Sequence, residues 1–475
     1  MTNGQQTPPT EPTAAEEAVR SSVEAALPST VADLAALVRI PSVSWSAFDP
    51  ANVAASADAV ATLLRDTGAF ESVEIKRAPI GDGEESGQPA VLATRAAKNG
   101  RPTVLLYAHH DVQPQGKDED WNTPPFEPTV RGDRMYGRGA ADDKAGVMAH
   151  VASVRALVDA LGNDFDLGLA VFIEGEEEFG SRSFANFLEQ NKAALEADVI
   201  VVADSDNVDV DTPALTVSLR GNVTFRLTVS TLEHASHSGM YGGAAPDAML
   251  AMVKLLATLH DDNGSVAVDG FTARTDAAEP PALSEEQFRE EAALLDGVTP
   301  IGTGPILSRM WSQPTITVTG IDAPSVANAS NTLLPSVSVR ISARVAPGQP
   351  AADAYAALER HLRANAPFGA HVAIDDVDTG EAFLVDTNGW AATEAKRAMT
   401  DAWGKEAVET GIGGSIPFIA DLVREFPEAQ ILVTGVEDPD SRAHSPNESL
   451  HLGVFKRAIL AEALLLARLD GRTGA

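Results

Sequence analysis

The chain has 475 residues, and 44% of them are hydrophobic. A chain of this length is longer than one compact core usually accommodates, so the sequence predicts two domains. It carries 68 acidic and 35 basic residues, a formal net charge of −33, which argues against nucleic acid and anionic membranes as partners. It has no cysteine, which excludes disulfides and thiolate metal sites and leaves histidine and carboxylate as metal ligands.

Residues 1–20 are predicted to form a disordered tail, because they are rich in Thr, Pro, Gln and Ala. The tail lacks the apolar segment of a secretory signal. No apolar run approaches the length of about 20 residues that spans a membrane. We therefore expect a cytoplasmic protein.

Apolar and amphipathic segments alternate over residues 21–213. From Val147 to Leu161, apolar side chains are spaced four, three, four and three residues apart. This spacing predicts a helix with one apolar face. Alternating strands and helices predict an α/β sheet covered by helices on both faces. The other expected elements are helices over 21–40 and 51–68 and strands over 73–77, 90–93, 103–107, 168–173 and 197–202.

The pattern changes over residues 214–385. Residues 222–230 and 336–345 alternate with period two, which is typical of strands with one solvated face. Helices are expected over 246–260 and 351–363, and an extended segment over 370–376. This order of strands and helices predicts an inserted α+β domain with an antiparallel sheet.

From residue 386 the α/β pattern resumes, with a helix that ends at Trp403, a strand over 430–434 and a helix over 452–469. The first domain is therefore expected to comprise residues 21–213 and 386–475.

Five polar clusters occur where the chain is expected to leave a strand or turn. In an open α/β sheet such residues meet at the carboxyl ends of the strands. Several carboxylates side by side need a compensating cation, and histidine with carboxylate suits zinc, manganese or cobalt. Each cluster alone also fits a solvated turn or a helix cap. The clusters are Ala108-His-His-Asp111, Gly139-Ala-Ala-Asp-Asp-Lys144, Glu174-Gly-Glu-Glu-Glu-Phe-Gly-Ser181, Ala203-Asp-Ser-Asp206 and Ala443-His-Ser-Pro-Asn-Glu448.

These clusters, in this order, resemble those of the M20 metallopeptidase family, and the resemblance covers nearly the whole chain after the tail. Among its members, carnosinase-like dipeptidases are most similar. The resemblance implies a catalytic domain with a mixed sheet, interrupted by a lid and dimerisation domain over 214–385. It also implies two zinc ions per chain, with manganese or cobalt as alternatives.

The resemblance assigns metal ligands residue by residue. His109 is expected to bind one ion, with Asp111 as the partner that orients its ring, and Asp204 completes that site. Asp142 is expected to bridge both ions and to precede a cis peptide bond. Glu178 and His444 complete the second site. Asp206 is the alternative to Asp204, and His110 receives no role.

Glu177 is expected to be the general base, since the two acids before Phe179-Gly180-Ser181 align with the family's pair and Glu176 then faces away. A slip of one residue among the three glutamates is the alternative. His237, rather than its neighbour His234, is expected to reach the active site of a partner subunit and to stabilise the oxyanion, which implies a homodimer.

The carboxylate of a small peptide substrate is expected to meet Arg344, or its same-face neighbour Arg340, and the turn that contains Gly414 and Ser415. The resemblance therefore implies a dipeptidase that uses a metal-bridged hydroxide. One departure is that residues 381–390 lack the histidine that some carnosinase-like enzymes carry there, so carnosine itself is not predicted as the substrate. Deacylation of N-acyl amino acids, and a catalytically silent metal-binding homologue, remain the alternatives.

Overall fold

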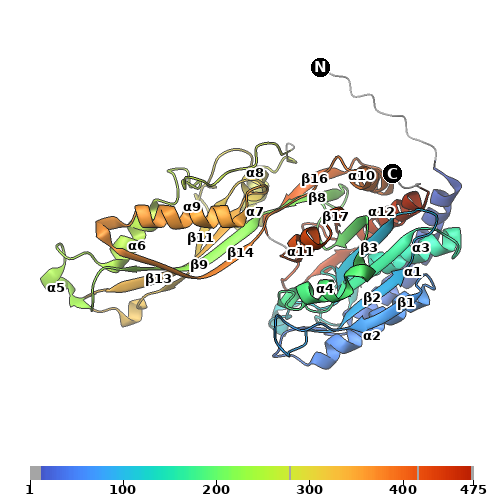
Figure 1. The fold of residues 1–475 in the computed structure, drawn as a ribbon, viewed down its shortest axis with the longest axis horizontal. Helices are drawn as coiled ribbons and strands as arrows, with labels where there is room; N and C mark the ends of the chain where they lie inside the picture. Colours follow the sequence, from blue (N-terminus) through green and yellow to red (C-terminus); the bar gives the residue numbers. More distant parts are fainter. Residues whose placement is uncertain (1–11, 278–279, 415–416, 472–475) are drawn as a thin grey trace, which may run out of the picture. The chain divides into compact units, whose positions relative to one another are not determined.

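The structure is a computed structural model that describes residues 12–277, 280–414 and 417–471. The chain divides into two compact units. The first comprises Met1–Thr216, Val385–Val408 and Asp421–Ala475, and the second comprises Val217–Leu384 and Glu409–Ala420. The expected insertion over 214–385 differs from the second unit mainly in lacking residues 409–420. Each unit can be followed by its labels in Figure 1.

The first unit is built on a mixed sheet. Its strand order is β1-β2-β6-β3-β7-β17, and Val433 of β17 then pairs antiparallel with Thr216 of β8. Strands β6, β3, β7 and β17 are parallel, whereas β1, β2 and β6 pair antiparallel. These strands are β1 (Ser72–Lys76), β2 (Ala90–Arg95), β3 (Thr103–His109), β6 (Gly168–Glu174), β7 (Val199–Ala203), β8 (Ala214–Leu219) and β17 (Gln430–Thr434).

Every residue of β6 and β7 is buried, because helices cover this sheet on both faces. Phe184 and Phe187 of α4 stack on Phe172 of β6, with ring centroids 5.5 and 4.4 Å apart. The predicted fold class is therefore confirmed. The helices are α1 (Ala14–Val38), α2 (Pro50–Asp66), α3 (Lys144–Leu161), α4 (Phe184–Leu195), α10 (Trp390–Trp403) and α12 (Leu452–Asp470).

The first helix begins earlier than expected, so the tail predicted over residues 1–20 is too long. Thr13 and Glu16 form a capping box, in which each side chain accepts the backbone N–H of the other residue. Glu16 also accepts a hydrogen bond of 2.6 Å from Arg468 of α12. These contacts hold residues 14–20 in the helix.

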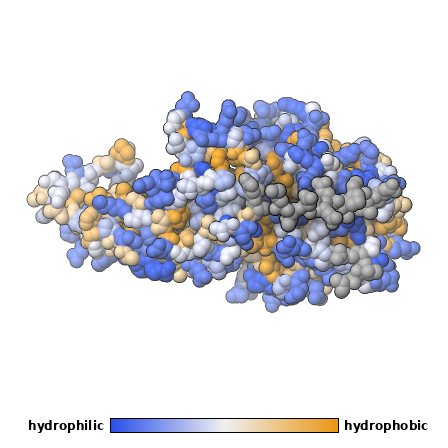
Figure 2. All heavy atoms as spheres, turned by 90° about the horizontal axis from the view of Figure 1, so that it is seen from above, coloured by the Kyte–Doolittle hydropathy of each residue, from blue (hydrophilic) through white to orange (hydrophobic). Residues whose placement is uncertain are grey.

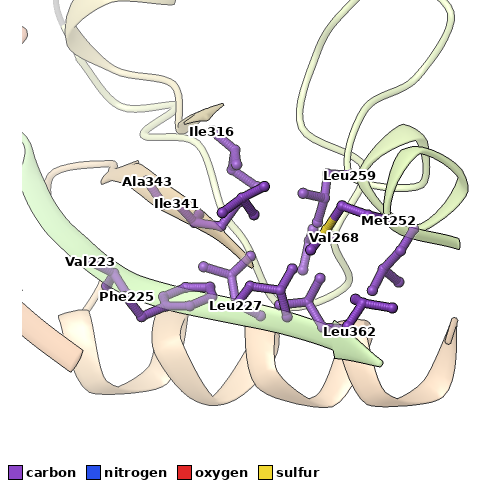
Figure 3. Close-up of a cluster of buried hydrophobic side chains, with 14 of the residues drawn as sticks. Val223, Phe225, Leu227, Met252, Leu259, Val268, Ile316, Ile341, Ala343 and Leu362 are labelled. Atoms are coloured by element: carbon purple, nitrogen blue, oxygen red, sulfur yellow. The ribbon is translucent and has the colours of Figure 1, made fainter. Parts of the chain in front are cut away.

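The second unit contains a four-stranded antiparallel sheet in the order β11-β13-β9-β14. Alternate residues of its central strands, such as Phe225 and Leu227 of β9 and Ile341 of β13, point into one apolar core together with Met252 of α6 and Leu362 of α9 (Figure 3). The period-two pattern predicted this arrangement. The elements are β9 (Gly221–Ser230), α6 (Ala248–Ala257), β11 (Thr315–Asp322), β13 (Ser336–Val345), α9 (Ala351–Ala364) and β14 (His371–Gly380).

Hydrophilic residues cover much of the face in view in Figure 2, with hydrophobic residues between them. Within the described ranges, no helix has both the length and the apolar character that a membrane crossing requires. The remaining elements are β4 (Thr129–Arg131), β5 (Arg134–Tyr136), β10 (Ser236–His237), α5 (Ser238–Tyr241), α7 (Glu285–Glu291), α8 (Ile306–Trp311), β12 (Thr332–Leu333), β15 (Phe383–Leu384), β16 (Val408–Ile412), α11 (Pro417–Glu425) and β18 (Ser449–His451).

Candidate metal centre

Three strand ends of the first unit bring polar residues to one edge of the sheet. His109 is the last residue of β3, Glu174 is the last residue of β6 in register with it, and Asp204 follows the last residue of β7. Because these strands are parallel neighbours, their carboxyl ends lie at the same edge. Asp142 lies two residues before α3 begins. Residues far apart in the sequence therefore converge here.

Two groups of potential ligands share one residue. His109, Asp142 and Asp204 form the first group, and Asp142, Glu178 and His444 form the second, with the ligand atoms of each group all within 4.8 Å of one another. Nε2 of His109 lies 3.2 Å from Oδ1 of Asp142, while Nε2 of His444 lies 3.0 Å from Oδ2 of the same carboxylate. Asp142 thus presents one oxygen to each group.

The other distances in the two groups are also short. Nε2 of His109 lies 3.9 Å from Oδ1 of Asp204, and Nε2 of His444 lies 3.2 Å from Oε2 of Glu178. The Asp142–Asp143 peptide is cis, as the family resemblance implied. Asp206, the alternative to Asp204, belongs to neither group.

The electrostatics of the two groups favour bound positive charge. Burial raises the pKa of Asp204 to about 7, and burial and then Asp142 raise the pKa of Glu178. Hydrogen bonds to Asp142 and Glu178 raise the pKa of His444 to about 11. Such shifts mean that a nearby positive charge stabilises the anionic forms of Asp204 and Glu178. Imidazole and carboxylate donors in this number fit a divalent ion such as zinc.

Asp111 is positioned to orient His109. It is buried, and its Oδ1 lies 3.3 Å from Nδ1 of His109. Its carboxylate also accepts hydrogen bonds from the Ser44 hydroxyl at 2.7 Å and from the backbone N–H groups of Glu177 and Glu178 at 3.1 Å each. These donors hold the acid in place, and a fixed acid fixes the imidazole ring.

The three consecutive glutamates face different surroundings. Glu176 accepts hydrogen bonds from the backbone N–H of Ser183 at 2.9 Å and from Arg182 at 3.1 Å, away from both ligand groups. Glu178 belongs to the second group and accepts a hydrogen bond of 2.7 Å from Gln113.

Glu177 differs from both of its neighbours. Its side chain is 20% exposed, and its carboxylate approaches Nε2 of His109 to 4.0 Å. No described residue donates a hydrogen bond to this carboxylate, and burial raises its pKa well above the ordinary value. A partly open carboxylate of raised pKa beside the ligands has the properties of a general base.

Sequence reasoning assigned no role to Glu448, although it lies in the last cluster. This buried carboxylate accepts the backbone N–H groups of Gly139, Ala141 and Asp142 at 2.9 to 3.1 Å and pairs with Arg138 at 2.6 Å. It therefore holds the loop that carries Asp142. The Glu at the end of the AHSPNE stretch was visible in the sequence, but its partners were not.

The surroundings of His110 are those of a residue that supports the fold. Its ring is buried, and Nε2 lies 2.9 Å from the backbone oxygen of Pro89. Burial lowers the pKa of His110 to about 4, so the ring is neutral near pH 7. It belongs to neither ligand group.

The remaining predicted site residues belong to the second unit. His237 is exposed, and its Nδ1 accepts the backbone N–H of Gly239 at 3.0 Å. Arg340 is exposed, whereas Arg344 on β13 and Gly414 are half-buried. Ser415 lies outside the described residues.

Arg220 was not singled out in the sequence. Its Nε donates a hydrogen bond of 2.9 Å to the backbone oxygen of Gly413. Burial, and then the charge of Arg344, lower the pKa of Arg220 to about 10. A Cβ on Gly413 would lie 2.9 Å from Nη2 of Arg220, so a larger residue there would shift the guanidinium. Two guanidinium groups beside a glycine-rich turn are suited to a carboxylate ligand.

Residues 105–468 match the family described as Peptidase family M20/M25/M40. The chain is 36% identical over 380 residues to a cysteinylglycine-S-conjugate dipeptidase of Corynebacterium striatum, covering 79% of this chain and 83% of that protein. It is 28% identical to the human Beta-Ala-His dipeptidase, covering 82% and 79%.

Two solved structures have the same fold. The dipeptidase Dug1p of Saccharomyces cerevisiae superposes with a TM-score of 0.73 at 22% identity, covering 97% of this chain and 99% of that one. Human carnosine dipeptidase 1 gives a TM-score of 0.73 at 24% identity, covering 97% and 100%.

Proposed function

The chain belongs to the M20 family of peptidases, and on this premise we propose that it is a dipeptidase that works with two divalent metal ions. The observation that carries the proposal is the sharing of Asp142 by two groups of ligand atoms. Paired metal sites occur in several classes of enzyme, aminopeptidases among them. The relatives named as dipeptidases support a small peptide as the substrate.

In this proposal one ion is held by His109, Asp142 and Asp204, and the other by Asp142, Glu178 and His444. Zinc is the first choice because the donors are imidazole nitrogens and carboxylate oxygens without a thiolate, and manganese or cobalt are the alternatives.

The residues around the ligands then have separate tasks. Bound ions supply a water of lowered pKa and polarise the scissile carbonyl. The carboxylate of Glu177 accepts the proton of the attacking water, and its raised pKa favours this uptake. Glu177 then delivers the proton to the leaving amine. Asp111 keeps the imidazole of His109 in the orientation that leaves Nε2 free for the ion.

Arg344, Gly414 and Ser415 are proposed to bind the carboxylate of the substrate, and Arg220 joins them because it donates a hydrogen bond to the same turn. His237 would stabilise the oxyanion in the active site of a partner subunit of a homodimer. Its exposure, and the exposed apolar residues Leu250 and Val253 of α6, support such a partner. A cytoplasmic location stays a prediction.

The test is hydrolysis of a dipeptide panel and an N-acyl amino acid panel by purified protein loaded with zinc or manganese. We expect free amines from the dipeptides and two ions per chain by elemental analysis. Cleavage of N-acyl amino acids alone would instead identify a deacylase. Two bound ions without turnover of either panel would identify a silent homologue.

A further inference from the structure

Glu437 is a carboxylate beside the ligand groups that the proposed mechanism leaves unused. It follows β17 by three residues, where the chain runs directly along the end of β7. Its backbone N–H lies 3.4 Å from the backbone oxygen of Ser205, and its own oxygen accepts the N–H of Asn207 at 2.9 Å. These bonds form a parallel bridge between Glu437 and Asp206.

Gly435 makes this close approach possible. A Cβ at this position would lie 1.4 Å from the backbone oxygen of Ser205, so any side chain would push the two segments apart. The fold therefore brings Glu437 into register with Asp206, two residues after Asp204, by a contact that only glycine permits.

The side chain of Glu437 faces acids. Burial raises its pKa well above the ordinary value, and the carboxylates of Asp142, Glu448, Asp204 and Asp206 raise it further. Among the described residues, no side chain or backbone group donates a hydrogen bond to its carboxylate or forms an ion pair with it. The residue is partly exposed and belongs to neither ligand group. It is thus an open, unpaired acid at the edge of the candidate metal centre.

The two ligand groups already use the carboxylates of Asp142, Glu178 and Asp204, and Glu437 belongs to neither group. Because the carboxylate of Glu437 has no donor of its own among the described residues and lies in register with Asp206, a further cation is favoured at this place. A dipeptide brings such a cation, because its α-ammonium group is two bonds from the scissile carbonyl carbon.

We propose that Glu437 binds the free α-ammonium group of the dipeptide, and thereby makes the enzyme select substrates with a free amino terminus over N-acyl amino acids. This inference rests on the proposed dipeptidase function. It assigns specificity to a residue outside the metal ligands, since an N-acyl amino acid offers a neutral group at the place where Glu437 requires a charge.

The test compares Ala-Ala with N-propionyl-alanine, which lacks only the amino group, in the wild type and in Glu437→Gln. A charge-assisted hydrogen bond to the ammonium corresponds to about a 10- to 100-fold loss of kcat/KM for Ala-Ala, mostly through KM. N-propionyl-alanine, measured as substrate or as competitive inhibitor, should change little. Glu428→Gln removes the same charge at the exposed segment before β17 and should leave both compounds unaffected.

Two further measurements keep the outcomes distinct. Glu437→Asp retains the charge and should recover part of the preference for Ala-Ala. The metal content of Glu437→Gln should remain that of the wild type, and loss of an ion would make Glu437 a ligand and overturn the ammonium role. An unchanged preference in a folded Glu437→Gln that still cleaves dipeptides overturns this inference alone. A wild type that cleaves no dipeptide overturns the proposed function and this inference with it.

Discussion

Oδ1 of Asp111 lies 3.3 Å from Nδ1 of His109, and the carboxylate of Asp111 also accepts the backbone N–H groups of Glu177 and Glu178. One buried acid therefore connects the end of β3 with the turn that carries the proposed base and a proposed ligand. A change in its position would alter all three residues together, since each is fixed by a hydrogen bond or close contact to the same two oxygens.

The first prediction concerns this acid. Asp111→Asn replaces a carboxylate oxygen with an N–H donor, which no longer favours the correct tautomer of His109. We expect metal affinity or activity to fall about 10- to 100-fold. Metal titration of the apoprotein and dipeptide kinetics measure the two effects. Ser44→Ala is the matched control, because it removes only one hydrogen bond of 2.7 Å to Asp111, and it should have a smaller effect.

The second prediction separates the three glutamates. Glu177→Gln should lower kcat by about 10²- to 10⁴-fold and retain both metal ions, because it removes only the proton acceptor. Glu176→Gln should lower thermal stability with little change in kcat, since Glu176 bonds to Ser183 and Arg182. If Glu176→Gln abolishes turnover while Glu177→Gln does not, the assignment of the base is off by one residue.

The third prediction uses the shared ligand. Asp142→Ala should lose both ions, whereas Asp204→Ala and His444→Ala should each lose one, because only Asp142 belongs to both groups. Elemental analysis after dialysis gives the stoichiometry. Removal of metal from the wild type with a chelator should also lower the melting temperature, and excess zinc should restore it. Equal losses in all three variants would contradict a shared carboxylate.

The fourth prediction concerns Glu448. Glu448→Gln removes the anion that pairs with buried Arg138 and accepts the N–H groups of the Asp142 loop. Removal of one partner of a buried ion pair costs about 3–5 kcal/mol of unfolding free energy. Denaturant unfolding measures this loss, and metal titration should show weaker binding. The charge-matched control Glu428→Gln lies at an exposed position and should change neither quantity.

The fifth prediction is a pH dependence of stability. Burial by itself lowers the pKa of His150, but Glu462, whose Oε2 lies 2.9 Å from Nδ1, raises it above the ordinary value of 6.5. A raised pKa means that the folded state holds the proton more tightly. The stabilisation is therefore complete below about pH 6.5 and declines as the pH rises through the folded pKa.

Unfolding experiments at pH 6 and pH 9 test this dependence. Glu462→Gln should reduce the difference in stability between the two pH values, because the anion that holds the proton is gone. A variant with the same pH dependence as the wild type would show that His150 does not contribute. Apoprotein should be used throughout, since metal binding is itself pH-dependent.

The sequence determined the local elements and the chemistry of the site. The period-two pattern of residues 336–345 and the apolar stripe from Val147 to Leu161 each became the expected element, because burial on one face imposes that spacing. Strand β11 was not predicted, although polar and apolar residues alternate from Thr315 to Thr319; only Ile316 of its eight residues is buried. The helix start at Ala14 was missed, although Thr13 and Glu16 have capping-box spacing.

The residues proposed as metal ligands were named from the sequence, because the acids and histidines occur in the family's order, and the structure brings them together in two groups. Glu437, Glu448 and Arg220 could not be found in this way. Each acts through a partner that is distant in the sequence, such as Asp206 for Glu437, and that partner depends on which strands lie side by side. Local patterns determine that a strand forms and where it ends, but only the tertiary structure decides that β17 lies beside β7, because strand order depends on the packing of the whole sheet.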